Sequence, residues 1–211
     1  MRTTTAPVIR LEDNTPPPYT VRHVDLDIDL HPSETRVIAK LSVERMSGTA
    51  TSEPLWLDGD ELELVSLTID GESLVASAYT LGDTGISISQ VPETDTFQVE
   101  IETSLAPENN TKLTGLYLSN GVYCTQCEAQ GFRRITFFPD RPDILATYDV
   151  RLEGEKAQCP TLLSNGNPGE TGDLDNGRHF ARWNDPHPKP SYQYAAVGGD
   201  LDVLSADFTT A

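Results

Sequence analysis

The chain has 211 residues, of which 37% are hydrophobic and 23% charged, a composition typical of one or two small globular domains. Fifteen Lys and Arg residues stand against 33 Asp and Glu residues, and the resulting net charge of −18 argues against a nucleic-acid partner. No apolar run is long enough to span a bilayer, so no membrane segment is expected.

The start of the chain is polar and ends in three consecutive prolines at 16–18. This composition predicts an extended lead-in over residues 1–18, and it contains no apolar stretch typical of a secretory signal. Three cysteines, an odd and low number, argue against a disulfide framework. A cytoplasmic location is therefore expected.

The first predicted strand has a period of two. Apolar and acidic residues alternate in it: Val24, Leu26, Ile28 and Leu30 are expected to point inward, and Asp25, Asp27 and Asp29 outward. Three acids at this spacing also suggest a calcium loop. Such a loop requires a glycine after the third acid and short polar residues between the acids, so the outer face of a strand is favoured.

Further short strands follow at 36–44, 54–57, 62–69, 85–88, 96–101, 116–119 and 122–124. Residues 31–35 are predicted to join the first two strands as a hairpin. Asp70-Gly71 is a turn signal, and Asn120-Gly121 predicts a tight two-residue hairpin. Residues 141–146 are the best helical candidate, with one or two turns. The pattern predicts an all-β sandwich of mostly antiparallel strands with little helix.

The histidines and cysteines supply no complete catalytic site. None of His23, His31, His179 and His187 begins a His-Glu-x-x-His zinc motif, and surface positions are expected for them. Cys124 and Cys127 form a single Cys-x-x-Cys pair, for which two free thiols on a strand are favoured over a metal or redox site. Cys159 is expected to be an incidental third thiol. By motif alone, a binding or structural module is favoured over a self-contained enzyme.

Several blocks resemble one known family. They read Cys-Thr-Gln-Cys-Glu-Ala-Gln-Gly-Phe-Arg at 124–133, Asp-Arg-Pro-Asp at 140–143, Leu-Ser-Asn-Gly-Asn at 163–167 and Pro-Lys-Pro-Ser-Tyr at 188–192. This pattern resembles the first domain of bacterial aminopeptidase N-type enzymes, the gluzincin zinc aminopeptidases. The resemblance covers roughly residue 19 to the C-terminus. It implies a saddle-like β-sandwich over 19–211 as the N-terminal domain of such a protein.

The resemblance also implies what the chain does not contain. In that family a catalytic domain follows the first domain, packs on it, and carries a Gly-Ala-Met-Glu-Asn motif and the His-Glu-x-x-His zinc helix. Neither motif occurs in this sequence. The expectation is therefore that zinc belongs to the full-length enzyme, that no cofactor is bound here, and that this chain alone does not hydrolyse peptides.

Two residues of the chain are implied in substrate binding. By resemblance, Glu128 matches the family's acidic residue that holds the α-ammonium of a peptide substrate, and Gln126 matches its neighbour in the first subsite. Residues two apart on an extended strand share a face, so both side chains are expected to address one pocket while Thr125 and Cys127 face away. The resemblance further suggests a cis peptide bond between Glu128 and Ala129.

A non-enzymatic β-sandwich that binds a partner protein is the alternative. On the sequence alone, Gln126 and Glu128 also fit the solvent face of an ordinary strand. The two interpretations differ in what the gene encodes after Ala211: an in-frame His-Glu-x-x-His motif supports the aminopeptidase, and a stop codon supports the interaction module.

Overall fold

A computed structural model describes residues 10, 12, 14–204, 206–207 and 209. The predicted lead-in therefore lies partly outside the described residues. Its described end, residues 14–18, is irregular, and the carbonyl oxygen of Pro18 accepts a hydrogen bond of 2.9 Å from the backbone N–H of Met46. Arg141 Nη2 also donates to the carbonyl oxygen of Thr15 at 2.8 Å. These contacts hold the chain against the body just before the first strand.

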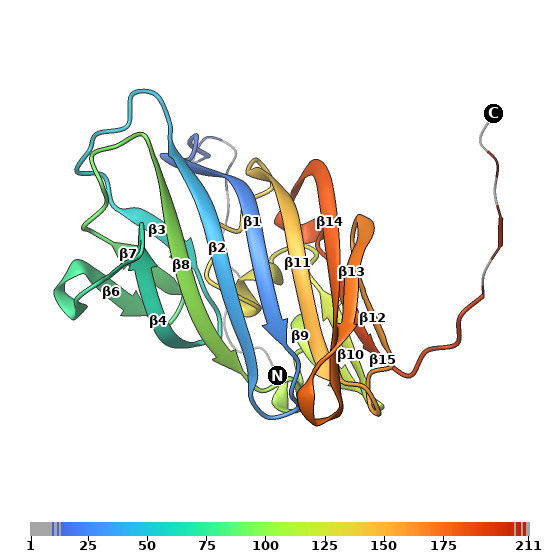
Figure 1. Ribbon diagram of the computed structural model, residues 1–211. Helices are drawn as coiled ribbons and strands as arrows, with labels where there is room; N and C mark the ends of the chain where they lie inside the picture. The colour runs from blue at the N-terminus through green and yellow to red at the C-terminus, as the bar shows by residue number, and fades with distance from the viewer. Residues whose placement is uncertain (1–9, 11, 13, 205, 208, 210–211) are drawn as a thin grey trace.

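The main layer is an eight-stranded sheet with the order β13-β14-β11-β1-β2-β8-β4-β5 (Figure 1). Its strands are β1 (Tyr19–Asp29), β2 (Thr35–Arg45), β4 (Glu63–Ile69), β5 (Glu72–Ser73), β8 (Thr96–Leu105), β11 (Leu145–Glu155), β13 (Asn167–Asp173) and β14 (Arg178–Pro190). Within the described ranges β1 and β11 form the one parallel pair, and the other paired strands run antiparallel.

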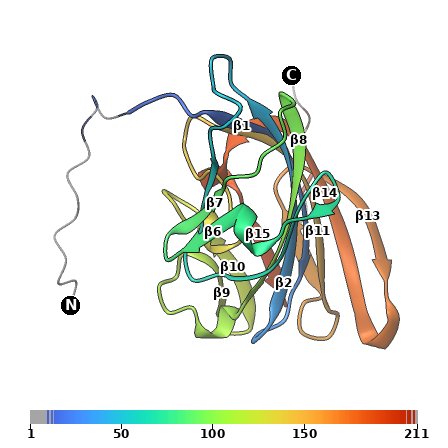
Figure 2. The ribbon, with the colours of Figure 1, turned by 90° about the vertical axis from the view of Figure 1, so that its left-hand side faces the viewer.

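Two smaller sheets form the second layer, on one face of the large sheet (Figure 2). One has the order β12-β15-β10-β9 and the other β3-β7-β6. Their strands are β3 (Leu55–Asp58), β6 (Tyr79–Gly82), β7 (Gly85–Ile88), β9 (Gly115–Ser119), β10 (Val122–Gln126), β12 (Thr161–Ser164) and β15 (Ala196–Gly199). The expectation of an all-β, mostly antiparallel sandwich is confirmed.

Helix is confined to short 3₁₀ turns in the described part of the chain. They are η2 (Ala76–Ala78), η3 (Pro107–Asn109), η4 (Phe132–Arg134), η5 (Asp175–Gly177) and η6 (Ser191–Gln193). No helix among the described residues has the length and apolar content required to cross a bilayer.

The alternation predicted for the first strand is confirmed in β1. Val24, Leu26 and Ile28 are at most 1% exposed and pack in the core between the layers. Asp27 and Asp29 lie on the outer face, where they pair with Arg151 of the adjacent β11 and Arg178 of β14, one strand further along. Apolar burial of this kind supplies most of the stabilisation of the sandwich, and the acids belong to a strand and not to a calcium loop.

The helical prediction for residues 141–146 is wrong. The segment contains a four-residue turn and no helix. A 3.3 Å hydrogen bond from the backbone N–H of Ile144 to the carbonyl oxygen of Arg141 closes the turn, and β11 begins at Leu145. Ile144 and Ala146 are fully buried, whereas Leu145 is 45% exposed. This alternation has the period of a strand, and pairing with β14 extends the chain.

The predicted turn at Asp70-Gly71 and the predicted two-residue hairpin at Asn120-Gly121 are both confirmed. Asn120 and Gly121 join β9 to β10 with φ angles of +50° and +81°, and Asp70 and Gly71 join β4 to β5 with +50° and +83°. Positive φ at both central residues matches the right-handed twist of the flanking strands, and Asn, Asp and Gly tolerate it best. The first of these hairpins places β10, the strand that ends at Gln126.

Candidate functional site

Gln126 and Glu128 lie where β10 ends and a turn begins. Both residues are exposed, and Gln126 Nε2 donates a 3.2 Å hydrogen bond to the backbone carbonyl oxygen of Glu128. The peptide bond between Glu128 and Ala129 is cis, as predicted. The structure therefore places the two predicted site residues next to each other on the surface, in hydrogen-bond contact.

The prediction that one strand carries both residues is wrong, because β10 stops at Gln126 and Glu128 belongs to the following turn. The backbone N–H of Gly131 donates to the carbonyl oxygen of Cys127 at 2.8 Å and closes this turn. Gly131 packs so tightly on the strand end that a Cβ atom there would lie 2.2 Å from the carbonyl oxygen of Gln126. A glycine is required for this close approach.

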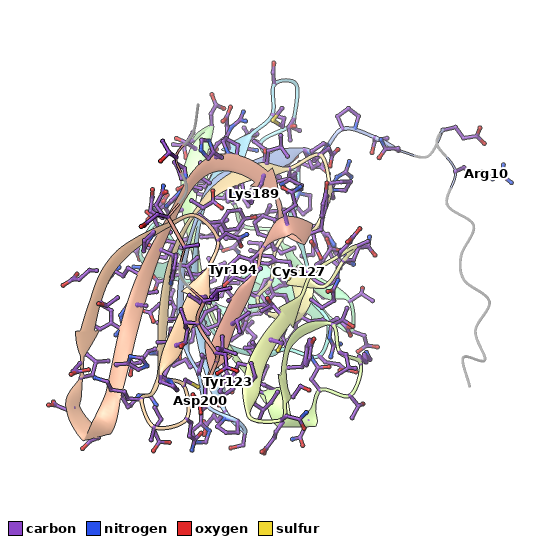
Figure 3. All side chains as sticks on the ribbon, turned by 90° about the vertical axis from the view of Figure 1, so that its right-hand side faces the viewer. Arg10, Tyr123, Cys127, Lys189, Tyr194 and Asp200 are labelled. Carbon is purple, nitrogen blue, oxygen red and sulfur yellow. The ribbon has the colours of Figure 1, made fainter. Side chains whose placement is uncertain are left out.

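Thr125 and Cys127 face away from the surface pair, as predicted. Thr125 Oγ1 donates to the carbonyl oxygen of Ala196 at 3.0 Å and accepts from its backbone N–H at 2.8 Å, which ties β10 to β15. Cys127 is 3% exposed. Figure 3 shows it beside Tyr194 in the interior, where burial raises the pKa of Tyr194 and the nearby Cys127 adds to the rise. The turn therefore has a buried anchor immediately before Glu128.

Phe132 is a second buried anchor, just after the exposed tip of the turn. It is fully buried, and its ring meets Phe138 at 5.1 Å and Tyr194 at 5.2 Å between centroids, both edge to face. Aromatic pairs in this geometry contribute about 0.5–1.5 kcal/mol beyond the area that they bury. We define residues Cys127–Arg133 as the site turn: Cys127 and Phe132 near its ends are buried, Arg133 is half-buried, and Glu128, Ala129 and Gln130 form its exposed tip.

A buried arginine holds the chain after the site turn. The side chain of Arg134 is 6% exposed, and it donates to Asp60 at 2.5 Å, to Glu61 at 2.7 Å and to the carbonyl oxygen of Thr114 at 3.0 Å. These hydrogen bonds keep the pKa of Arg134 above its ordinary value although burial opposes this, and they hold the pKa of Glu61 below its usual range together with Lys112.

The carboxylate of Glu128 has no hydrogen bond or ion pair with any residue that the structure describes. Gln126 uses its Nε2 group toward the turn, and within the described chain its Oε1 atom takes part in no hydrogen bond. Gln126 at the end of β10 and Glu128 at the exposed tip of the site turn thus each present an oxygen acceptor, and that of Glu128 is charged. Such a pair is suited to a small cationic group that carries several N–H donors.

The four histidines do not gather into a metal site. His23 hydrogen-bonds Thr147 at 2.8 Å, and His179 Nε2 lies 2.6 Å from the carbonyl oxygen of Cys159. His31 and His187 are exposed, as expected, whereas His23 and His179 are half-buried. Among the residues with described positions, no group of three or more His, Cys, Asp or Glu is arranged to hold a metal ion.

The three cysteines are free thiols. Cys124 lies on β10, but Cys127 follows the strand end, so the prediction of two thiols on one strand is correct for Cys124 alone. Burial raises the pKa of both groups, and the nearby carboxylate of Asp140 adds to the rise at Cys127. Redox-active thiols have a lowered pKa, so the raised pKa of both thiols disfavours a redox role for this pair.

Asp140 has no role predicted from the sequence, although it lies in the Asp-Arg-Pro-Asp block. The side chain of Asp140 is 1% exposed and is directly hydrogen-bonded to Arg133 at the end of the site turn. The only signal in the sequence was a charged residue among aromatic and proline residues, and that signal does not identify its partner.

Comparison with known proteins shows the family to which the chain belongs. The family pattern described as "Peptidase M1 N-terminal domain" matches residues 18–193. Aminopeptidase N of Caulobacter vibrioides is 50% identical over 210 residues, covering 100% of this chain and 24% of that protein. Aminopeptidase N of Escherichia coli is 44% identical over 194 residues, covering 92% of this chain and 22% of that protein.

Solved structures share the fold. Legionella pneumophila aminopeptidase A, in complex with aspartic acid, has a TM-score of 0.87 at 38% identity, covering 92% of this chain and 23% of that one. The M1 zinc metallopeptidase of Deinococcus radiodurans has a TM-score of 0.73 at 18% identity, covering 87% of this chain and 43% of that one, which shows the fold alone. This chain spans about a quarter of the length of the aminopeptidase N relatives. From its sequence and its fold, the chain belongs to the Peptidase M1 N-terminal domain family.

Proposed function

We propose that this chain is the substrate-anchoring domain of a zinc-dependent aminopeptidase, which removes N-terminal amino acids from peptides. One observation carries the proposal: exposed Gln126 and exposed Glu128 are joined by a hydrogen bond from Gln126 Nε2 to the carbonyl oxygen of Glu128, where β10 leads into a turn held by the buried side chains of Cys127 and Phe132. Membership in the Peptidase M1 N-terminal domain family and the relatives named aminopeptidase N support it.

The α-ammonium of a peptide is the cation that this pair fits. Glu128 would accept a charge-assisted hydrogen bond from it, and Gln126 Oε1 would accept a second. Because Gln126 Nε2 already donates to the turn, the amide presents its oxygen and not its nitrogen. Hydrogen bonds to charged groups contribute about 1.5–3 kcal/mol each. The relative from Legionella pneumophila, which holds aspartic acid, carries such an α-amino group on its ligand.

The same pair would discriminate against internal peptide bonds. An internal segment offers no ammonium group, so binding it here would bury the Glu128 carboxylate without a partner. Leaving a charged group unpaired costs more than the hydrogen bond contributes. This penalty supports an exopeptidase in preference to an endopeptidase.

In the proposal, the described residues of this chain do not bind the zinc. The sequence contains no His-Glu-x-x-His motif, and the half-buried histidines are engaged elsewhere, His23 with Thr147 and His179 with Cys159. In the proposal, the metal belongs to the part of the relatives that this chain does not cover. The chain by itself is expected to show no peptidase activity with zinc and an aminoacyl chromogenic substrate.

The proposal includes a partner and a location. Residues 19–211 would form one domain behind a lead-in over 1–18, and a catalytic domain would pack against it and complete the pocket over Gln126 and Glu128. The free N-termini of peptides would be the substrates. A cytoplasmic location fits three cysteines that are all free thiols.

The test uses the gene product that carries this chain. Glu128→Gln keeps the size of the side chain and removes its charge, and we expect kcat/KM for L-alanine p-nitroanilide to fall about 10- to 150-fold, the equivalent of one charged hydrogen bond. Gln130→Ala, at the exposed tip of the same turn, is the matched control and should stay within about twofold of wild type.

Two results would contradict the proposal. Unchanged kcat/KM in Glu128→Gln would remove Glu128 from the site. A gene that encodes no His-Glu-x-x-His motif, together with a purified product that releases no p-nitroaniline, would favour a non-enzymatic interaction module.

A further inference from the structure

The carboxylate of Asp140 lies in the interior, next to the site turn. Its side chain is 1% exposed, and Oδ2 accepts hydrogen bonds from the backbone N–H of Arg133 at 3.2 Å and from Arg133 Nε at 3.1 Å. Oδ1 accepts a hydrogen bond from the hydroxyl of Ser191, in η6. Three donors from two separate segments therefore converge on one buried charge, as buried carboxylates require.

Arg133 and Asp58 extend this contact to the three-stranded sheet. Arg133 Nη2 donates to the carbonyl oxygen of Asp140 at 3.2 Å, and Nη1 lies 3.4 Å from Asp58 Oδ1 on β3. Asp58 Oδ2 accepts from the backbone N–H of Asp140 at 3.0 Å, and its main chain forms a bridge with Phe138. We call Asp58, Arg133, Asp140 and Ser191 the Asp140 cluster.

The Asp140 cluster acts on both ends of the site turn. Arg133 is the last residue of the turn, and both its backbone and its side chain are bound by Asp140. Cys127 is the first residue, and it lies close enough for the charge of Asp140 to raise the pKa of its thiol beyond the effect of burial. The exposed tip between them has a single closing hydrogen bond within the turn, from Gly131 to Cys127.

A turn closed by so few bonds keeps considerable conformational freedom unless its ends are fixed. Burial makes the charge-assisted bonds of Asp140 strong and directional. The buried side chains of Cys127 and Phe132 are apolar or nearly so, and they fix how deeply the ends of the turn are buried. The hydrogen bonds of Arg133 to Asp140 are directional, so they also fix the orientation of the turn. A displacement of about 1 Å is enough to impair a binding group.

We propose that Asp140 is a positioning residue: through Arg133 it fixes the site turn in the orientation in which Glu128 meets the substrate ammonium. The kinetic consequence rests on the function proposed above, whereas the effect on the turn itself does not. A purely structural role for Asp140 would instead lower the stability of the whole domain and leave the turn no more mobile than its surroundings.

Hydrogen–deuterium exchange in the gene product tests the effect on the turn. In Asp140→Asn we expect the amides of 127–133 to exchange about tenfold faster or more, while those of β1 and β2 keep their protection. Ser191→Ala removes one donor and leaves Arg133 in place, and it should give a smaller acceleration in the same segment. Asp143→Asn alters a surface ion pair with Arg141 and serves as the control. Unchanged exchange in the turn, or equal acceleration throughout the domain, would overturn the proposal.

Steady-state kinetics test the consequence for substrate. We expect KM for L-alanine p-nitroanilide to rise about tenfold in Asp140→Asn and about threefold in Ser191→Ala, with kcat per folded enzyme within about twofold of wild type. Arg133→Lys should not preserve the contact with Asp140, because an ammonium group cannot make the same set of hydrogen bonds as a guanidinium group. A lower rate per total enzyme with an unchanged KM would mean loss of folded enzyme only, and would overturn the positioning role.

Glu128→Gln separates the two proposals. If that variant retains full kcat/KM, the proposed function fails, and the exchange data still decide whether Asp140 fixes the turn. If Glu128→Gln loses activity while Asp140→Asn and Ser191→Ala change neither the exchange of 127–133 nor KM, the positioning role fails and the proposed function stands.

Discussion

Two arginines on the outer face of the large sheet and two beside the site turn use their hydrogen bonds differently. Arg151 and Arg178 each bridge carboxylates of neighbouring strands, and every such bond joins two side chains. Arg133 and Arg134 also bind carboxylates, but each donates to a backbone carbonyl oxygen as well, that of Asp140 and that of Thr114.

The difference follows from the backbone around each pair. On the outer face, β1, β11 and β14 are already held by their own ladder of hydrogen bonds, so the ion pairs add a few tenths of a kcal/mol to about 1 kcal/mol each and fix no position. The segment after β10 has little ladder to hold it, and there the arginines supply the missing backbone partners. Loss of a charged side chain should therefore matter more beside the site turn.

The largest loss of stability is expected at Gly115, which is tightly packed next to the site turn. Gly115 has φ +72°, and a Cβ atom there would lie 2.5 Å from Arg134 Cβ and 3.0 Å from the carbonyl oxygen of Gly131. Gly115→Ala should lower the free energy of unfolding by roughly 3 kcal/mol, from overpacking and positive φ together. Urea unfolding followed by circular dichroism measures the loss.

Gly121 is the control for this change. Its φ is +81°, but a Cβ atom would meet nothing within 4 Å, so Gly121→Ala should cost only about 1 kcal/mol. Equal losses in the two variants would show that close packing beside the site turn adds nothing to the cost of positive φ.

The next largest effect is expected for Arg134→Ala. The variant removes hydrogen bonds to Asp60, Glu61 and the carbonyl oxygen of Thr114 from a side chain that is 6% exposed. We expect a loss of about 2 kcal/mol, less than for a fully buried pair because both acids reach solvent. Arg36→Ala, which breaks an exposed pair with Glu102 on the large sheet, should cost less than about 1 kcal/mol. A larger loss in Arg36→Ala would reverse the comparison between the two regions.

A smaller, pH-dependent effect is expected for Glu153 on the outer face. Burial alone would raise its pKa, but hydrogen bonds from Arg178 and Arg151 outweigh burial and hold the pKa below its ordinary value. A lowered pKa in the folded state means that the stabilisation is complete above about pH 4.3 and is lost as the pH falls through the folded value. Glu153→Gln should therefore cost about 1 kcal/mol at pH 7 and less at pH 3, in urea titrations at both pH values. A loss that is the same at both would contradict this assignment.

The smallest effect is expected for Asp29, which shares Arg178 with Glu153. Here burial is the largest influence and the pKa is raised despite the contact with Arg178. A raised pKa means that the folded state binds a proton more tightly than the unfolded state, so the charged form is penalised at pH 7 and the penalty is relieved as the pH falls. Asp29→Asn should change the free energy of unfolding at pH 7 by no more than about 0.5 kcal/mol. A clear loss would show that the ion pair dominates instead.

The regular parts of the fold were predictable from the sequence because their signals are local. The alternation in β1 and the Asn120-Gly121 turn each specify a backbone conformation within a few residues. The failure at 141–146 has the same origin: a proline and an acid after an arginine resemble a helix start, and only pairing with β14 fixes the segment as extended. The site turn was predicted as a strand because nothing local to Glu128 indicates that Gly131 closes back on Cys127.

The sequence by itself determined the all-β class, the inward face of β1 and the turns at Asp70-Gly71 and Asn120-Gly121. Its family resemblance led to the prediction that Gln126 and Glu128 bind substrate. The tertiary structure decided where those side chains lie, that Cys127 and Phe132 bury the ends of the turn, and that Asp140 binds Arg133 across it. The physical reason is distance along the chain. Periodicity and turn propensity act over neighbouring residues, whereas the partners of Asp140 lie at positions 58, 133 and 191 and meet only when the two layers pack.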